Sequence, residues 1–526
     1  MNASQADHRA EIAVIGAGIG GLAAAVRLAA AGADVMLLDR HDWPGGKMRA
    51  VSSPAGPVDA GPTVLTMRPV FEALFDAAGE RLDDHVTLIP QPILARHWWR
   101  GGPQLDLHSD SAQSAEAIGD AFGASAAREF LAFDTLMGAA LDAFEAPMMR
   151  AARPDALAAA YRSLTRPGIW PLIAPGRTLE GLLRARFTEP RLRQLFGRYA
   201  TYVGGIPSRT PAVLGLIWRA EAAGVWAVKG GMSSLAQALA ALFVQLGGRL
   251  CLGTPVARFE VSGDTLSGLI LADGRRIACR QAVFNGDPEA LRAGLLGAGA
   301  QRAVGRAATT PRALSARVWT FAAKVSGLPL LHHNLLLADD ARDEFVPLAR
   351  NQAPVMPTIY ICAQDRAAPA EAAGMERFQF ILNAPACSPD SHADPHAEAA
   401  TCLTPTFDRL SRFGLTFTPI PTAANLTTPA EFASLFPGSQ GSLYGRSPHG
   451  TLAPFLRPTA RTRITGLYLA GGGAHPGAGV PMAALSGMHA AAAALSDRTS
   501  VSTLRQTATP GGILTRSATT APARFR

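Results

Sequence analysis

The sequence predicts an α/β, Rossmann-like fold in which segments from both ends of the chain build one parallel sheet. Residues 11–39 read as strand, glycine turn, helix and strand, and residues 466–495 read as strand, glycine loop and helix. The 291–451 stretch alternates β-like runs with polar loops. Because the glycine-rich ends lie more than 400 residues apart, we predict a discontinuous nucleotide-binding domain joined to a mixed β-sheet domain and a helical region.

The first of these elements follow from local composition. Ile12 to Ile15 is a short apolar, partly β-branched run, which is typical of a buried parallel strand. Ala23 to Ala31 is rich in Ala and Leu and favours a helix, and Gly32 stands where that helix would end. Val35 to Leu38 is a second apolar strand.

Three glycines between the first strand and the helix have G-x-G-x-x-G spacing. Gly16 suits a tight turn, Gly18 lets the backbone approach a pyrophosphate, and Gly21 lets the helix pack on the strand. Asp39 ends the second strand, eighteen residues after Gly21, and can accept hydrogen bonds from a ribose hydroxyl. A glycine pattern alone arises by chance in an Ala/Gly-rich chain, so the prediction depends on strand, helix and acid being in register.

The composition limits the class of protein. The chain has 526 residues, of which 48 % are hydrophobic and 17 % charged, enough for two or three domains with sizeable cores. The five cysteines form no C-x-x-C pair, which argues for a reducing compartment and against a zinc site or a disulfide framework. The first ten residues do not resemble a secretory signal, and the uncharged stretch 464–495 contains two prolines and many glycines, so we predict no spanning helix.

The formal charge of +8 is carried almost entirely by arginine. Half of it lies in residues 497–526, where five arginines face one aspartate in a Ser/Thr/Ala-rich tail that we predict to be disordered. Arginines also crowd residues 150–186, interleaved with Tyr161, Trp170 and aliphatic residues. Such a mixture is typical of a membrane-surface segment, although an ordinary helix pair with a solvated basic face explains it equally well. No recognised nucleic-acid motif is present, so we predict no nucleic-acid partner.

Two further glycine-containing blocks make the resemblance to known sequences more specific. Residues 43–47 read Trp-Pro-Gly-Gly-Lys, which suits a loop crossing a pyrophosphate, and residues 58–63 read Val-Asp-Ala-Gly-Pro-Thr. Together with the glycine fingerprint, these blocks resemble the front end of the carotenoid (phytoene-type) desaturase family, FAD-dependent relatives of the amine oxidases. At the other end, Gly471-Gly472-Gly473 stands where amine oxidases have Gly-Asp, as in the desaturases. The resemblance covers roughly residues 11–496.

The resemblance implies bound FAD. Asp39 stands where many relatives have Glu, and Val256 matches a valine whose backbone meets the adenine of the flavin. The implied cofactor contacts are Gly16, Gly18, Gly20, Gly21, Asp39, Gly45, Gly46, Lys47, Gly61, Pro62, Val256, Gly471, Gly477, Val480 and Pro481. No metal is implied, and His332-His333 is interpreted as structural because it lacks a ligand-spaced partner.

The reacting bond of a polyene has no acidic proton and no polar handle, so the flavin would accept a hydride while a neighbouring proton is lost. We assign no catalytic residue. Asp59, His97 and His475 are candidates only because they lie in or near the motifs, and each is more readily explained as structural. His97-Trp98-Trp99 could form aromatic walls for an apolar substrate or simply pack in the core.

Within the family, residues 61–79, 85–99 and 195–205 are most similar to the hydroxyneurosporene (1-hydroxycarotenoid 3,4-) desaturases of purple bacteria. This implies C3–C4 desaturation of an acyclic carotenoid, 1-hydroxyneurosporene or methoxyneurosporene, in spheroidene- or spirilloxanthin-type biosynthesis of photosynthetic bacteria. Phytoene desaturase is the near alternative. A flavin-free lipid- or prenyl-binding module and a soluble amine oxidase are alternatives of other classes.

These interpretations give a domain plan and a location. We expect the enzyme to be peripheral on the cytoplasmic side of the inner or intracytoplasmic membrane, with a homo-oligomer possible. The predicted segments are an FAD-binding domain in residues 11–85, 226–290 and 456–496, a helical membrane-associated region in 86–225, a substrate domain in 291–455 and a disordered tail in 497–526.

Overall fold

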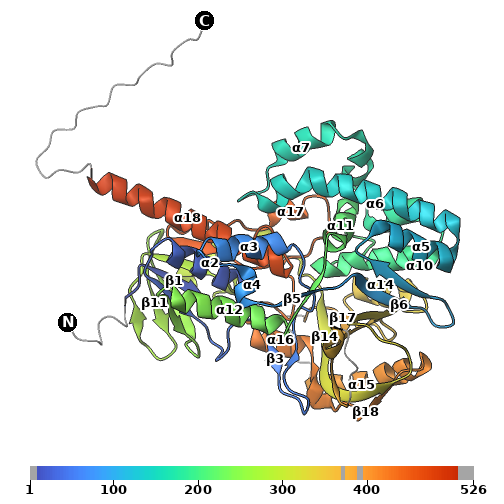
Figure 1. Ribbon diagram of the computed structural model, residues 1–526. Helices are drawn as coiled ribbons and strands as arrows, with labels where there is room; N and C mark the ends of the chain where they lie inside the picture. The colour runs from blue at the N-terminus through green and yellow to red at the C-terminus, as the bar shows by residue number, and fades with distance from the viewer. Residues whose placement is uncertain (1–8, 369–373, 388–394, 507–526) are drawn as a thin grey trace, which may run out of the picture.

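The computed structural model describes residues 9–368, 374–387 and 395–506, and Figure 1 shows the course of the chain. A five-stranded parallel sheet collects strands from the beginning, middle and end of the sequence, in the order β20-β13-β1-β2-β9. The strands are β1 (Ile12–Ile15), β2 (Val35–Leu38), β9 (Arg249–Cys251), β13 (Gln281–Phe284) and β20 (Leu467–Leu469). Most of their side chains are buried, as expected when helices cover a parallel sheet.

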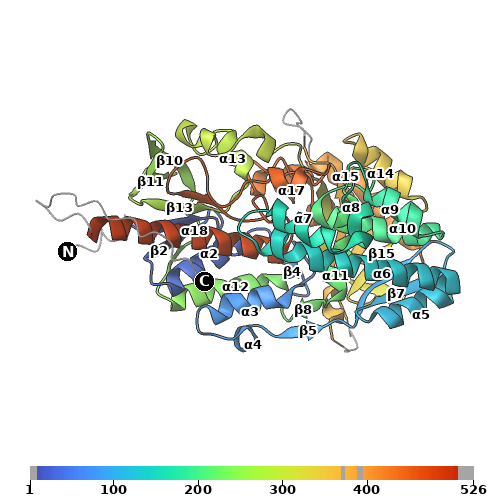
Figure 2. The same cartoon turned by 90° about the horizontal axis from the view of Figure 1, so that it is seen from above.

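Helices from the same three stretches pack together on this sheet. They are α2 (Ile19–Ala30), α12 (Met232–Gln245) and α18 (Val480–Gln506). In Figures 1 and 2 the red α18 runs beside the blue α2. Their approach is so close that a Cβ on Gly487 would lie 2.0 Å from the carbonyl oxygen of Gly20. Small residues therefore bring the C-terminal glycine loop to the N-terminal one.

A second, eight-stranded sheet forms the other half of the molecule. Its path is β18-β14-β17-β16-β15-β6-β7, with β19 paired to β14. Only β15 and β6 pair in parallel, so the sheet is mixed, as predicted. The strands are β6 (Ile93–Trp98), β7 (Gln104–His108), β14 (Ser315–Ser326), β15 (His333–Leu336), β16 (Ile359–Ala363), β17 (Glu376–Ala384), β18 (Thr416–Thr418) and β19 (Leu426–Thr427). The β6–β7 hairpin supplies two of these strands, although the predicted domain plan placed residues 86–225 in the helical region.

Helices over residues 111–222 stand above this sheet in Figure 1. They enclose an aromatic core in which Phe130, Phe196 and Trp218 contact one another. The helices are α5 (Ser111–Phe122), α6 (Ala124–Phe144), α7 (Ala156–Leu164), α8 (Trp170–Ile173), α9 (Leu179–Arg186), α10 (Pro190–Gly197) and α11 (Ile217–Ala222). Within the described residues, no helix combines the length and apolar character needed to cross a bilayer.

The remaining elements pack against these bodies or connect them, and β10, β11 and β12 form a separate three-stranded sheet. The helices are α3 (Arg68–Asp76), α4 (Leu82–His85), α13 (Pro288–Arg292), α14 (Ala341–Ala349), α15 (Pro395–Arg412), α16 (Pro429–Leu435) and α17 (Ala453–Leu456). The strands are β3 (Ala50–Val51), β4 (Val58–Asp59), β5 (Leu88–Pro90), β8 (Trp226–Val228), β10 (Val256–Ser262), β11 (Thr265–Leu271) and β12 (Arg276–Ile277).

The sequence predicts a disordered tail from residue 497 onward, whereas the structure has helix over the first ten of these residues. Helix α18 continues to Gln506, and its continuation is tied to the domain by side chains. Asp497 accepts hydrogen bonds from Arg461 (2.7 Å) and from the Tyr468 hydroxyl (2.8 Å). The rest of the predicted tail, residues 507–526, lies outside the described residues.

Candidate functional site

A cavity of about 590 Å³ opens where the first parallel strands end. Both glycine-rich ends of the chain line it, together with the start of β10 and the 435–445 loop. Among the predicted contacts, those that line it are Gly16, Gly18, Gly20, Asp39, Gly45, Gly46, Lys47, Gly61, Pro62, Val256, Gly471 and Val480. Ligands of open α/β sheets bind outside the carboxyl ends of the strands, which is where this cavity lies.

Three predicted contacts are not among the lining residues, and each has a packing reason. A Cβ on Gly21 would lie 1.9 Å from the Gly16 carbonyl oxygen, so this glycine allows helix and strand to touch. Gly477 adopts φ +139° beside the Arg457 guanidinium, and Pro481 is buried in the first turn of α18.

Backbone packed tightly against backbone forms the floor of the cavity. Gly18 pairs with Gly45 as an isolated parallel bridge, and Gly45 N–H donates to the Ala17 carbonyl at 2.8 Å. A Cβ on Gly20 would meet the Cα of Gly471 at 2.8 Å. The N-terminal glycine turn, the Gly45-Gly46 block and the C-terminal glycine loop therefore meet at one point.

The N-terminus of α2 faces this floor without a side-chain cap. Its N-cap residue, Gly18, provides no hydrogen-bonding side chain. The free N–H groups of the first turn and the helix dipole favour an anion there, as a pyrophosphate would be.

Asp39 is almost fully buried at the edge of the cavity. Its Oδ2 accepts from Ala17 N–H at 2.5 Å, and its Oδ1 accepts from His41 N–H at 2.8 Å. Each carboxylate oxygen keeps further acceptor capacity, so the side chain can hold the glycine turn and still receive a hydroxyl.

Lys47 is partly buried. Its Nζ donates to the Leu443 carbonyl at 2.8 Å and lies 5.6 Å from the centre of the Phe436 ring. Burial lowers the Lys47 pKa to about 8, with Asp287 acting in the opposite direction and Arg312 in the same one. The side chain thus bridges from the Gly45-Gly46 block to the 442–443 backbone on the opposite wall.

Two residues that hold the glycine loops were not predicted from the sequence. Asn285 follows β13, and its Nδ2 donates to the Gly16 carbonyl at 3.0 Å. A Cβ on Gly18, Gly20 or Gly471 would approach this same amide group to within 3.0 Å. An AVFNGDP segment ends a predicted strand, but nothing in its local pattern places Asn285 among three glycine turns.

Arg457 is the other unpredicted residue. Its guanidinium is buried and donates to the carbonyls of Gly472 (2.8 Å), Tyr444 (3.1 Å) and Arg446 (2.8 Å). Burial lowers its pKa to about 10, and nearby Arg446 acts in the same direction. These bonds fix the C-terminal glycine loop to the 444–446 wall of the cavity.

None of the candidate catalytic residues lines the cavity. The Asp59 carboxylate accepts from the N–H groups of Met232 and Ser233 and so caps α12; burial raises its pKa, although these hydrogen bonds oppose the shift. His97 Nδ1 lies 3.2 Å from the Leu105 carbonyl, and burial lowers its pKa to about 4. His475 Nε2 lies 2.8 Å from the Ala151 carbonyl. These contacts support structural roles for all three residues.

The aromatic pair beside His97 is also buried. Trp98 packs in the core of the eight-stranded sheet, and Trp99 packs between β6 and the helices. Both side chains therefore pack in hydrophobic cores, and neither lines the glycine-lined cavity.

His332, His333 and Cys362 bring three metal-ligating atoms within 4.8 Å of one another. Hydrogen bonds occupy one nitrogen of each ring: His332 Nδ1 lies 3.0 Å from the Ala363 carbonyl and His333 Nδ1 lies 2.7 Å from the Tyr360 hydroxyl. These contacts fit the structural interpretation, although the three side chains could hold an ion.

The cavity fits FAD on the criteria of shape and donor groups. It has a glycine floor that a Cβ would fill, an uncapped helix N-terminus for a pyrophosphate and a carboxylate for a ribose. Gly18, Gly45 and Gly46 would hold the pyrophosphate, and Asp39 and Val256 would lie at the nucleoside.

Comparisons with known proteins agree with this geometry. Residues 19–313 match the family described as flavin containing amine oxidoreductase. The chain is 56 % identical to a hydroxyneurosporene desaturase of Cereibacter sphaeroides, over 93 % of this chain and 98 % of that protein. It is 49 % identical, over the same shares, to one of Rhodobacter capsulatus. A lycopene-forming phytoene desaturase of Pseudescherichia vulneris is 30 % identical, over 89 % and 95 %.

Among solved structures, putrescine oxidase resembles the fold with a TM-score of 0.57 at 15 % identity, over 93 % of this chain and 99 % of that one. Since the family is flavin-containing and the cavity fits the cofactor, the cofactor is FAD. The chain therefore belongs to the flavin-containing amine oxidoreductase family, within its carotenoid desaturase branch of hydroxyneurosporene desaturases from purple bacteria.

Proposed function

We propose that this oxidoreductase acts on a CH–CH bond and desaturates C3–C4 of an acyclic 1-hydroxy or 1-methoxy carotenoid such as hydroxyneurosporene. The observation that carries the proposal is the similarity to hydroxyneurosporene desaturases along nearly the whole chain, well above that to phytoene desaturase. FAD, when bound, supplies the acceptor for the hydride removed from the substrate. The protein supplies the cradle, excludes water and orients the bond.

A buried polar cluster beside the cavity is our candidate for holding the substrate hydroxyl. Glu221 accepts hydrogen bonds from the hydroxyls of Tyr199 and Tyr202, the latter at 3.0 Å. Burial raises the Glu221 pKa, while the two tyrosines oppose that shift. Within the described residues no ion pair with a cation is found for this carboxylate. A buried carboxylate without a cation is costly, and perturbed buried carboxyl groups of this kind concentrate at functional sites.

Tyr360 is the residue near this cluster that is hydrogen-bonded toward the flavin cavity. This hydroxyl lies 2.7 Å from Thr63 Oγ1, and Thr63 directly follows the cavity residues Gly61 and Pro62. Burial raises the Tyr360 pKa well above its usual value; Cys362 adds to the shift, as do Tyr202 and Glu221 to a smaller extent. Tyr360 is therefore hydrogen-bonded to the segment at the cavity edge and feels the charge of Glu221.

The proposal is tested with flavin-loaded enzyme in liposomes and four substrates: hydroxyneurosporene, methoxyneurosporene, neurosporene and phytoene. We expect hydroxyneurosporene to exceed neurosporene in kcat/KM by at least roughly tenfold, which is about 1.4 kcal/mol. Glu221→Gln should reduce this preference more than it reduces turnover of neurosporene. Conversion of phytoene but not hydroxyneurosporene would select the phytoene desaturase alternative, and tight flavin with no turnover of any carotenoid would reject the substrate class.

We further propose peripheral attachment to the cytoplasmic side of the inner or intracytoplasmic membrane through residues 148–187. Several large apolar side chains there are exposed: Leu157 (85 %), Tyr161 (70 %), Leu164 (67 %) and Trp170 (49 %). Helix α17 lies near α7 in both views and exposes Leu452, Phe455 and Leu456 (Figures 1 and 2). Arginines beside such a surface favour an interface with anionic lipid.

Liposome flotation tests this attachment. Binding should require anionic lipid, weaken in salt and fall when Arg162, Arg166 and Arg177 become Glu. The matched control reverses Arg258, Arg275 and Arg280, which are exposed on the nucleotide domain. Equal losses in the two triple variants would mean that only net charge matters. Light scattering of the detergent-solubilised enzyme would decide between a monomer and a homo-oligomer.

A further inference from the structure

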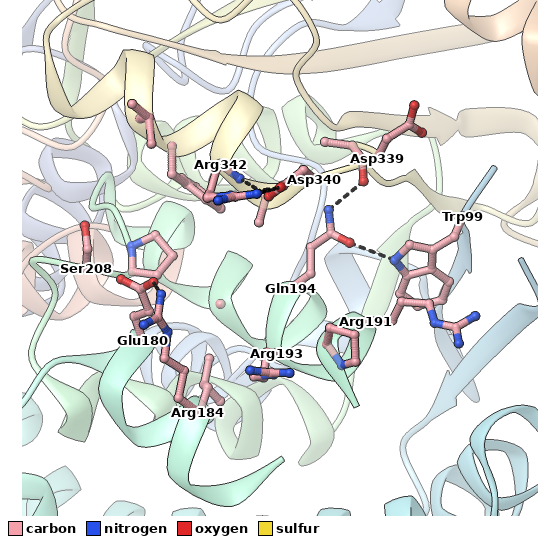
Figure 3. Close-up of a pocket in the computed structure, with 18 of the residues that line it drawn as sticks. Trp99, Glu180, Arg184, Arg191, Arg193, Gln194, Ser208, Asp339, Asp340 and Arg342 are labelled. Atoms are coloured by element: carbon pink, nitrogen blue, oxygen red, sulfur yellow. Dashed lines mark hydrogen bonds and ion pairs between the residues drawn. The ribbon is translucent and has the colours of Figure 1, made fainter. Parts of the chain in front are cut away.

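A second cavity, of about 1180 Å³, lies between the helical region and the eight-stranded sheet (Figure 3). Helices α9 and α10 form one wall, and the 338–350 segment with α14 forms the opposite wall. The turn of the β6–β7 hairpin and the 207–209 loop close the ends. This cavity shares no lining residue with the glycine-lined cavity, so FAD binding does not explain it.

Arginine dominates the lining. Seven arginines face three acidic residues, a net charge of +4. Each lining carboxylate already has an arginine partner, and Arg191 pairs with Glu189 outside the lining. The three lining pairs are Glu180–Arg184 (2.6 Å), Asp339–Arg100 (2.6 Å) and Asp340–Arg342 (2.6 Å).

Three lining arginines have no ion pair within the described part of the chain: Arg193, Arg209 and Arg350. Arg193 donates through Nη2 to the Thr188 carbonyl at 3.1 Å, but its Nε is buried without a hydrogen-bond partner. Leaving a buried charged donor unsatisfied is unfavourable, and an anion in the cavity would relieve it.

Hydrogen bonds hold the walls at a fixed distance. Gln194 bridges the cavity side, accepting from Trp99 Nε1 at 2.8 Å and donating to the Ala338 carbonyl at 2.7 Å (Figure 3). Arg209 donates to the Ala349 carbonyl at 3.2 Å, which fastens the 207–209 loop to the end of α14 beside Arg350. The positive side chains therefore line a built cavity that two bridges hold together.

We propose that this cavity binds a phosphate or diphosphate group. Arginine is the side chain that matches oxyanions of this geometry, and three unpaired guanidinium groups can balance two or three negative charges. The remaining lining includes Leu183, Pro207, Phe345 and Val346, so an apolar chain attached to the phosphate also finds contacts. The source of the group is therefore an anionic lipid headgroup or a soluble phosphate, which the experiment separates.

The test uses FAD-loaded full-length enzyme and three probes: pyrophosphate, dihexanoylphosphatidic acid and dihexanoylphosphatidylcholine. Trp99 reports locally, because the difference in fluorescence between the wild type and Trp99→Phe isolates its signal; calorimetry gives the dissociation constant independently. We expect binding of phosphatidic acid or pyrophosphate, weaker in salt. In Arg193→Gln/Arg209→Gln/Arg350→Gln we expect the dissociation constant to rise by roughly tenfold or more.

The control variant is Glu180→Gln/Arg184→Gln, which removes a pair in the same cavity without changing net charge; its affinity should stay within about threefold of the wild type. Phosphatidic acid binding more tightly than pyrophosphate identifies a lipid source, and the reverse identifies a soluble one. The proposal is overturned if neither anion binds, if phosphatidylcholine binds as tightly as phosphatidic acid, or if the arginine and control variants lose affinity equally.

Discussion

Helices α2 and α12 begin after similar motifs, but the N-terminus of α2 is left free for a ligand and that of α12 is capped by the protein itself. Each follows a short buried strand and a glycine turn, Gly16 to Gly18 before α2 and Gly230-Gly231 before α12. At α2 no side chain caps the first turn, and the cavity opens in front of it. At α12 the carboxylate of Asp59, 173 residues away in sequence, accepts from Met232 and Ser233 N–H.

A strand–glycine–helix motif thus creates a potential anion site, and a distant side chain decides whether that site stays open. An internal carboxylate satisfies the N–H groups of α12, as a phosphate would satisfy those of α2. Asp59 belongs to the block that also supplies Gly61 and Pro62 to the cavity. The 59–62 segment therefore caps α12 through Asp59 and lines the cavity in front of α2 through Gly61 and Pro62.

The largest effect is expected from blocking the uncapped N-terminus of α2. Gly18→Leu should abolish FAD binding, at least about a hundredfold in dissociation constant, because a Cβ there lies 2.9 Å from Asn285 Nδ2 and its branches would fill the pyrophosphate position. Released-flavin fluorescence measures the bound fraction, and circular dichroism checks folding. Gly305→Leu is the control, since its Cβ would meet only the Arg463 guanidinium, at 3.8 Å. Full flavin retention in folded Gly18→Leu would refute the assignment.

The next largest effect is expected for Lys47, the cation near the uncapped N-terminus of α2. The Lys47 pKa is lowered in the folded state to about 8, so between about pH 8 and 10.5 the unfolded chain binds the extra proton. The cost of burying the charge is therefore fully present below pH 8 and is relieved as pH rises toward 10.5. Lys47→Met should stabilise the flavin-free protein at pH 7 by up to about 3 kcal/mol, less the lost hydrogen bond to Leu443.

Denaturant unfolding of both proteins at pH 7, 8, 9 and 10 checks the sign. The other titrating groups are common to both, so the difference in free energy of unfolding isolates Lys47. That difference should shrink as pH rises; a constant or growing difference would show that Lys47 is not buried as a charged group.

Removing the Asp59 cap from the N-terminus of α12 should have a smaller effect, and it should change stability alone. Asp59→Ala leaves the buried Met232 and Ser233 N–H groups without their acceptor, which costs about 1–3 kcal/mol. Thermal melts should show the loss, while flavin bound per folded molecule stays within about twofold. Asp110→Ala removes a comparable but exposed cap from α5 and should cost no more than about 1 kcal/mol. Loss of flavin without loss of stability would place Asp59 in the cofactor site.

The two helix N-termini also differ in how far the local sequence predicts them. Spacing and composition predicted the glycine turn, the first two strands and α2, because these depend on neighbouring residues. The Asp59 cap and the Gly16–Asn285 bond join residues 173 and 269 positions apart, and a single Asp or Asn carries no signal of such a partner. The same applies to β6 and β7, which lie early in the chain but complete a sheet whose other strands begin at Ser315.

The smallest effect is expected for Asn285, which holds the glycine turn before α2. Asn285 donates to the Gly16 carbonyl at 3.0 Å and stands against the Gly20 and Gly471 backbone, so it fixes the loops relative to one another without filling the cavity. Asn285→Ala removes one neutral hydrogen bond and should weaken FAD binding about fivefold, equivalent to about 1 kcal/mol. Asn285→Asp retains the size but puts an acceptor against the Gly16 carbonyl and a negative charge near the pyrophosphate, so it should weaken binding further. Calorimetric titration of the flavin-free variants measures both. Equal affinities for Ala and Asp would mean that Asn285 acts only through its volume, and the hydrogen bond to Gly16 would then not contribute to holding the turn open.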